Sequence, residues 1–165
     1  MNGAATALAL DSRELRQAYA AHPSGVVALC ATTDGERTGM ALSSFVPVSL
    51  EPPLVAVCIQ NTSTTWPKLL RAEALGISVL GTEHTAAVRA LASKSGDRFA
   101  GVHTESRRSG ALFLAGSPLT LEVTVHDVVA AGDHQLVLLA VRDVTVWDEG
   151  APLVFHRSSF HRLAG

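Results

Sequence analysis

Two adjacent prolines, Pro52 and Pro53, separate two apolar segments that both have the composition of β-strands. Proline has no backbone N–H to donate to a neighbouring strand, so it is confined to sheet edges, strand starts and turns. The chain must therefore form a strand, a rigid turn and a second strand in this region. Small hydroxyl residues stand at the two ends of this unit, Ser43 and Ser44 before the turn and residues 62–65 after it. Because the strands fold back at the prolines, the sequence predicts that the two hydroxyl clusters approach one another.

Length and composition predict a single ordered domain. The chain has 165 residues, of which 47% are hydrophobic and 17% are charged, and this is the composition of a globular protein with a sizeable core. Residues 1–10 are apolar but lack the preceding basic residue of a signal peptide, so we interpret them as a loose N-terminus before a domain of residues 11–165. A net charge of −2 without a basic run argues against nucleic acid as a partner. The chain also lacks the ~18 consecutive apolar residues of a membrane span.

The two cysteines favour a reducing compartment. Cys30 and Cys58 both lie in apolar, strand-like runs, and the sequence contains no Cys-x-x-Cys pair. Buried, reduced thiols are the ordinary state of such residues. We therefore expect a cytoplasmic protein.

The rest of the chain reads as mainly β with short helices. Leu119, Leu121, Val123 and Val125 alternate with polar residues, which is the period of a half-buried strand. The expected strands are residues 25–33, 36–48, 54–59, 76–80, 119–126, 136–146 and 153–156, with turns at Asp34-Gly35, Ala131-Gly132-Asp133 and 148–150. The expected helices are residues 11–22, begun by Asp11 and Glu14, a short one after Thr64 or Thr65, and residues 83–92 after Thr82; residues 93–110 form a polar loop or lid.

This order of elements predicts an antiparallel barrel of six to seven strands with helices at its edge. A doubly wound parallel sheet fits poorly because the helices are too few. A Rossmann dinucleotide site is disfavoured because no Gly-x-Gly-x-x-Gly follows a strand.

The sequence lacks the usual motifs of metal-binding sites and of serine hydrolases. The seven histidines show no ligand spacing such as His-x-x-x-His, and no acidic or cysteine partner stands in register with them. Ser43 and Ser44 are not part of a Gly-x-Ser-x-Gly elbow. Clustered hydroxyls and backbone N–H groups can instead hold a phosphate or a flat heteroaromatic ring, with Lys68, Lys94 or Arg98 as the cation. The alternative is that the hydroxyls are loop and cap residues and the charges are solvated.

Four segments in this order resemble one family. They are Gly39-Met-Ala-Leu-Ser-Ser-Phe-Val-Pro-Val-Ser-Leu-Glu-Pro-Pro-Leu54, Asn61-Thr-Ser-Thr-Thr-Trp-Pro67, Ala92-Ser-Lys-Ser-Gly-Asp-Arg-Phe-Ala-Gly-Val102 and Gly132-Asp133-His134. Over residues 13–163 the chain resembles the flavin reductases with the FMN-binding split-barrel fold, the small components that feed reduced flavin to two-component monooxygenases.

The resemblance implies a set of site residues. Those lining the flavin would be Met40, Ala41, Leu42, Ser43, Ser44, Cys58, Ile59, Gln60, Ser63, Thr64 and Thr65, and those closing over its phosphate side Ser93, Lys94 and Arg98. His134 would be the catalytic residue and would donate a hydrogen bond to the nicotinamide nucleotide. His156 stands where relatives often have Tyr, so Phe155 or Phe160 is an alternative stacking partner for the second nucleotide.

The implied activity is NAD(P)H-dependent reduction of FMN or FAD, with release of the reduced flavin to a partner monooxygenase. NADH is favoured over NADPH because no arginine cluster is evident on the nicotinamide side. A homodimer is expected, because strands that are apolar on both faces outnumber the helices available to cover them. The alternatives are a non-catalytic flavin- or haem-binding split-barrel module and a structural dimer that has lost its ligand.

His134 is expected at the mouth of a cavity, because a turn between two long strands lies at a barrel rim. Its neighbour Asp133 is not expected to pair with it, since adjacent strand residues point to opposite faces. The bland alternative is a turn histidine bonded to local backbone.

Overall fold

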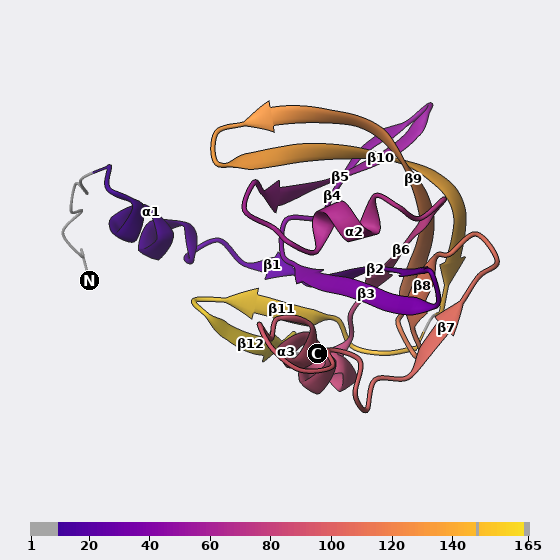
Figure 1. Cartoon of the computed structure of the whole chain (residues 1–165). Coiled ribbons are helices and arrows are strands. Elements are labelled where there is room, and N and C mark those ends of the chain that lie inside the picture. The colour runs from indigo at the N-terminus through magenta and orange to yellow at the C-terminus, as the bar shows by residue number, and fades with distance from the viewer. Residues whose placement is uncertain (1–9, 148, 164–165) are drawn as a thin grey trace.

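The computed structural model describes residues 10–147 and 149–163 (Figure 1). The helical elements are α1 (Ser12–Tyr19), α2 (Trp66–Leu69), the 3₁₀ turn η1 (Thr82–His84) and α3 (Thr85–Leu91). The strands are β1 (Ser24–Gly25), β2 (Val27–Thr33), β3 (Glu36–Leu42), β4 (Val46–Leu50), β5 (Pro53–Gln60), β6 (Leu75–Val79), β7 (Thr104–Ser106), β8 (Leu112–Leu114), β9 (Leu119–Ala131), β10 (His134–Val146), β11 (Leu153–His156) and β12 (Ser159–Arg162).

Seven strands form one antiparallel sheet in the order β3-β2-β6-β9-β10-β5-β4, and the sheet curves into an open barrel. Two small sheets flank it, β1-β11-β12 and β7-β8. The edges of the large sheet are β3 and β4, and no backbone ladder joins them within the described residues. The expected antiparallel barrel with short helices is therefore confirmed, and its split lies between β3 and β4.

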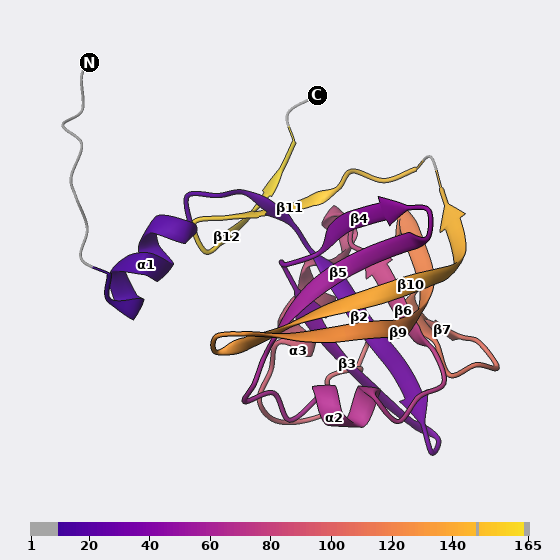
Figure 2. The same ribbon diagram turned by 90° about the horizontal axis from the view of Figure 1, so that it is seen from above.

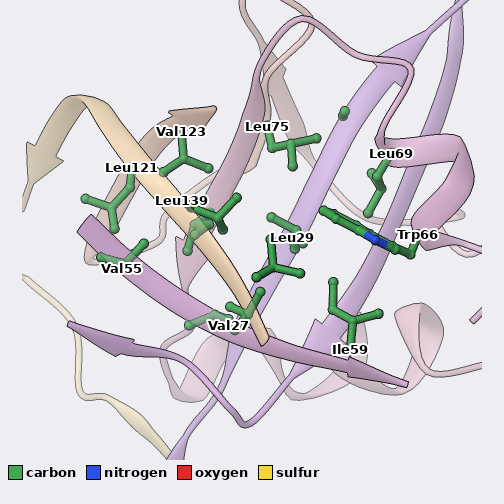
Figure 3. Packing of buried hydrophobic residues seen from close by; sticks show 14 residues of the cluster. Val27, Leu29, Val55, Ile59, Trp66, Leu69, Leu75, Leu121, Val123 and Leu139 are labelled. Carbon is green, nitrogen blue, oxygen red and sulfur yellow. The ribbon is translucent and has the colours of Figure 1, made fainter. Parts of the chain in front are cut away.

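The barrel encloses one hydrophobic core. Its buried side chains come from strands on both halves of the sheet, among them Leu29, Ile59 and Leu139, so the sheet must wrap around them (Figure 3). Trp66 and Leu69 point from α2 into this core and close one end of the barrel. The short helix is therefore held by the burial of two large apolar side chains rather than by its length.

The other face of β2 packs against a second core. Cys30 lies there with Leu91 of α3, Phe99 and Leu112 of β8. Burial on both faces explains why β2 reads as a continuous apolar run instead of an alternating one.

Several predicted elements are confirmed with small changes. The hairpin at Asp34-Gly35 joins β2 to β3, with both residues at positive φ, 52° and 78°. Strand β11 has the predicted bounds. The alternating strand continues beyond His126 to the end of β9, and helix α1 ends at Tyr19 rather than at residue 22. Residues 1–9 and Asp148 of the predicted turn at 148–150 lie outside the described residues.

Two predictions of local structure are wrong, and a third holds only in part. Thr82 does not cap a helix, because it already lies inside η1. Thr65, one of the two predicted caps, occupies the N-cap position of α2, but its side chain makes no capping hydrogen bond; the Ser63 hydroxyl accepts the hydrogen bond from the Trp66 N–H at 3.1 Å instead. The polar segment 93–110 contains strand β7, which pairs with the unpredicted β8.

Helix α1 stands apart from the barrel (Figure 2). The Asp11 carboxylate caps it by accepting from the N–H groups of Arg13 and Glu14, both at 2.9 Å. None of its side chains is buried. None of the helices in the described part of the chain has the length and apolar character needed to cross a bilayer.

Candidate functional site

A groove of ≈ 750 Å³ opens at the split of the barrel, where β3 and β5 end. Its lining residues are Met40, Ala41, Leu42, Ser43, Ser44, Cys58, Ile59, Gln60, Thr62, Ser63, Thr64, Thr65, Leu91, Ala92, Lys94, Arg98 and His134. The two hydroxyl clusters on either side of the prolines therefore do meet in one site. They meet because β3 and β5 deliver them to the same end of the barrel.

Ser44 extends the pairing of β4 with β5, because it lies two residues before Val46 and faces Cys58, two residues after Ala56. Its hydroxyl donates to the Cys58 carbonyl at 3.1 Å and accepts from the Cys58 N–H at 2.9 Å. Its side chain thus continues, beyond the last backbone pair, the connection between the start of β4 and the C-terminal part of β5. Since both hydrogen-bonding directions of the hydroxyl are used, Ser44 shapes the groove while the exposed Ser43 is left for a ligand.

Substitution of Ser44 by alanine should therefore act through the structure. The half-buried N–H and carbonyl of Cys58 would both lose their partner, and we expect a loss of about 1–3 kcal/mol in the free energy of unfolding. Ser43→Ala is the matched control and should change the unfolding free energy by less than about 0.5 kcal/mol. Urea denaturation of both variants measures the difference, and equal stabilities would contradict the bridging role of Ser44.

His134 reaches the groove because it opens β10 and pairs with Gln60 at the end of β5. The preceding turn is tied to the same loop, since Asn61 donates from its backbone to the Asp133 carbonyl at 3.0 Å and from its side chain to the Gly132 carbonyl at 3.1 Å. The imidazole is therefore held at the rim of the groove, as the sequence predicted.

The expectation that Asp133 and His134 do not pair is wrong. His134 Nδ1 lies 2.7 Å from the Asp133 carboxylate. Asp133 is a turn residue, so the alternation of side chains along a strand does not apply to it. The hydrogen bond and the charge of His134 hold the pKa of Asp133 below its ordinary value. With Nδ1 donating to the carboxylate, Nε2 is the ring nitrogen left for a ligand.

Arg98 is not a free surface cation. Its guanidinium donates to the Thr65 hydroxyl at 3.0 Å and to the Gly39 carbonyl at 3.2 Å, so it connects the 93–103 segment to α2 and β3. The side chain is half-buried, whereas Lys94 nearby is exposed. Two fixed hydrogen bonds aim the guanidinium in a way that a solvated arginine lacks.

The groove continues into a second, more polar cavity of ≈ 620 Å³. The two share Thr64, Thr65, Lys94 and Arg98. The charged residues around the second cavity are Arg37, Lys68, Lys94 and Arg98, against Glu36 and Asp97. We call this cavity the cationic annex; its excess of positive charge suits a phosphate at the end of a molecule whose flat part lies in the groove.

Two of the predicted site residues lie elsewhere. Ser93 does not line the groove, and its hydroxyl instead donates to the Ser95 carbonyl at 2.8 Å. His156 lies in the small sheet, where its Nε2 is 3.2 Å from the Ala21 carbonyl. Within one chain the structure does not bring His156 to the groove, so its contact with a nucleotide stays a prediction.

Leu91 and Ala92 line the groove from the end of α3 and were missed by the sequence reasoning. Their position follows from the packing of α3 against β3, for which the sequence offers no local signal.

The two cysteines also differ from each other. Burial raises the pKa of the Cys30 thiol to about 12, while Cys58 is half-buried and lines the groove.

The donor set fits a phosphorylated heteroaromatic ligand. Apolar side chains of Met40, Leu42, Ile59 and Leu91 offer walls for a flat ring, and the annex offers cations for its phosphate. No cluster of three or more metal-ligating side chains occurs in the described ranges. The fold and site thus define an open antiparallel barrel with a groove that suits a flat, phosphorylated cofactor.

Comparison with known proteins identifies the family to which this chain belongs. Residues 19–164 match the flavin reductase like domain. A flavin reductase of Pseudomonas putida is 35% identical over 157 residues, covering 94% of this chain and 92% of that protein. The reductase subunit HsaB of a flavin-dependent monooxygenase from Rhodococcus jostii is 31% identical over 159 residues, covering 96% of this chain and 82% of that protein.

Among solved structures, the NADH:FAD oxidoreductase SgcE6 of Streptomyces globisporus, in complex with NAD and FAD fragments, superimposes with a TM-score of 0.88. The two sequences are 31% identical, and the match covers 96% of this chain and 98% of that chain. The chain belongs to the flavin reductase family, a family of oxidoreductases. The resemblance inferred from the four sequence segments is therefore confirmed.

Proposed function

We propose that this protein is an NAD(P)H-dependent flavin reductase that reduces FMN or FAD and releases the reduced flavin to a partner monooxygenase. The observation that carries the proposal is one continuous site, with an apolar-walled groove, an oriented imidazole at its rim and a cationic annex beyond it. NADH is the favoured donor, because the groove offers no arginine cluster for the additional phosphate of NADPH. Arg98 is the one arginine among the described residues that line the groove, and its hydrogen bond to Thr65 holds it on the side of the annex.

A bound flavin and nicotinamide supply the redox chemistry themselves, so the protein has to position them and exclude water. In the proposal, Arg98 and Lys94 hold the flavin phosphate, and the apolar walls hold its ring. His134 positions the nicotinamide. Because Nδ1 is occupied by Asp133, a neutral His134 accepts a hydrogen bond at Nε2, as from a carboxamide, and donates there only when protonated.

The test of the activity is NADH or NADPH oxidation measured with FMN, with FAD and without added flavin. Oxidation that depends on added flavin supports a reductase for which flavin is a diffusible substrate. A non-catalytic flavin- or haem-binding module predicts a bound chromophore without turnover. Absence of flavin-dependent oxidation with all four cofactor pairs would contradict the proposal.

His134→Ala should raise the KM for NAD(P)H and slow flavin reduction, because the nicotinamide loses its positioning group. Equilibrium flavin binding should stay within about twofold, or roughly 0.4 kcal/mol. Stopped-flow flavin reduction measures the first effect and a flavin titration the second. A wild-type reduction rate with normal NAD(P)H dependence would return His134 to a structural turn residue.

Asp133→Asn is the matched control for the orientation of His134. The lowered pKa of Asp133 means that the carboxylate stays ionised throughout the neutral range, so the variant removes its charge at every working pH. The amide keeps a hydrogen-bonding oxygen for Nδ1, and a smaller loss of reduction rate than in His134→Ala is expected.

We also propose a homodimer. Exposed apolar side chains concentrate on three strands of the large sheet, Val46, Val48 and Leu50 on β4, Val125, Val128 and Val129 on β9, and Val144 and Val146 on β10. Leu50 is 91% exposed, which is costly for a lone barrel. Sedimentation at micromolar concentration should give a dimer, and a monomer would count against the proposal.

Two further observations support the proposed partner and the proposed compartment. The similarity to a reductase subunit of a flavin-dependent monooxygenase supports a monooxygenase as the recipient of reduced flavin. Two unpaired thiols support the cytoplasm as the location.

A further inference from the structure

Another polar pocket, distinct from the cationic annex and with a volume of ≈ 530 Å³, lies between η1 and α3 on one side and the β11–β12 hairpin on the other. Two guanidiniums, several hydroxyls and one aromatic ring face it, those of Arg89, Arg162, Thr82, Ser158, Ser159 and Phe160. The pocket shares no residue with the groove or its annex. Helix α3 separates them, since its final residue Leu91 lines the groove.

Two exposed arginines and no acidic residue line this pocket. Neither Arg89 nor Arg162 forms an ion pair with a carboxylate or a side-chain hydrogen bond in the described part of the chain. The segment 150–163 carries Arg157 and Arg162 with His156 and His161 and contains no Asp or Glu. Two guanidiniums that line one pocket and have no partner within the protein are available to an anion from outside it.

Both walls of the pocket are held in place. On one side, the buried His84 accepts from the Gly81 N–H at 3.1 Å and its other ring nitrogen lies 2.9 Å from the Ala115 carbonyl, which anchors the start of α3. On the other side, Arg157 and Ser158 form the hairpin turn with φ of 49° and 62°. Non-glycine residues occupy this region at a cost in free energy, so the turn is a specified feature.

Phe160 defines what the ligand carries besides the anion. Its half-buried ring packs against Phe155, with the centroids 5.5 Å apart, and lines the pocket next to the two hydroxyls of the turn. An aromatic ring in the same pocket as two guanidiniums is suited to a flat base attached to a phosphate. The volume falls in the range of small-molecule sites and is ample for a mononucleotide.

We propose that this pocket binds a mononucleotide, with its phosphate on Arg89 and Arg162 and its base against Phe160. The site shares no residue with the flavin groove, so Phe160 serves this ligand and not the nicotinamide nucleotide for which the sequence offered it as a stacking partner, and the proposal does not depend on the reductase activity. The turn hydroxyls of Ser158 and Ser159 would donate the remaining hydrogen bonds to the phosphate oxygens.

The test is a titration of the full chain with AMP, followed through its backbone amide NMR signals. AMP should shift the signals of residues 158–160 saturably, inorganic phosphate should shift them more weakly, and adenosine should not. Arg89→Gln and Arg162→Gln should each weaken AMP binding by about tenfold, the loss expected for one charged hydrogen bond. Arg142→Gln, on an exposed stretch of β10, is the matched control and should bind AMP as the wild type does.

Binding in the flavin groove gives a different pattern. If AMP shifted only groove residues, and if Arg98→Gln rather than Arg162→Gln abolished the effect, the proposal would be overturned. Reproduction of the same shifts by sodium chloride at matched ionic strength would also overturn it, because the pocket would then attract any anion. The unfolding temperatures of the two pocket variants should equal that of the wild type. A lower unfolding temperature would show that a variant loses AMP binding because its fold is destabilised.

Discussion

Replacement of Gly76 by alanine is expected to lower the free energy of unfolding by about 3 kcal/mol or more. Gly76 lies in β6 between β2 and β9, and a Cβ at this position would overlap the carbonyl oxygen of Leu112 in β8. The obstacle is backbone, so no rotamer change relieves it. Strand β8 cannot move away without breaking the 3.0 Å bond from the Leu114 N–H to the Ser78 hydroxyl.

Gly25→Ala is the matched control, because a Cβ there meets nothing within 4 Å and the residue also lies in a strand. Its unfolding free energy should stay within about 0.5 kcal/mol of the wild type. Urea denaturation of both variants measures the contrast. A Gly76→Ala protein as stable as Gly25→Ala would mean that β8 does not sit against β6 as described.

Replacement of Arg98 by alanine is expected to raise the KM for flavin by about ten- to a hundredfold, the equivalent of roughly 1.5–3 kcal/mol. The change removes a cation from the wall shared by the groove and the annex and releases Thr65 and the Gly39 carbonyl. The kcat should change less, since the guanidinium has no part in proton transfer and its loss is one of uniform binding.

Two companion variants locate the origin of this effect. Lys94→Ala removes an exposed cation from the same wall and should raise the flavin KM by a smaller factor. Thr65→Val removes one of the two hydrogen bonds that aim Arg98 while keeping the charge, so an intermediate KM is expected. Steady-state kinetics with varied flavin measures all three, and an unchanged KM in Arg98→Ala would show that the residue serves the fold alone.

The general architecture could be predicted because its strands carry strong local patterns. The alternation that begins at Leu119 and the Asp34-Gly35 turn each specify their structure within a few residues. The prolines at 52 and 53 likewise place a turn between β4 and β5. Strands β7, β8 and β12 were missed because three or four residues are too short to display a period, and Leu112–Leu114 is buried throughout.

The sequence predicted which residues line the site better than it predicted the hydrogen bonds between them. The two hydroxyl clusters were placed together from the strand, turn and strand around the prolines, and His134 was added to them through the family resemblance. The bonds that assign each group a task depend on contacts between distant segments, as for Ser44 with Cys58 or Arg98 with Gly39. Such contacts leave no mark in the spacing of residues. Asp133 was misjudged because a strand rule was applied to a residue in a turn.

The contrast between the two thiols makes this chain suitable for its own labelling assay. Cys30 is fully buried and its pKa of about 12 keeps it protonated at neutral pH, so alkylating reagents have neither access nor a thiolate to attack. Cys58 is the other cysteine of the sequence and lines the groove. The rate of single-site alkylation by a maleimide therefore reports directly whether the groove is filled, without any engineered residue and without reliance on the absorbance of the flavin.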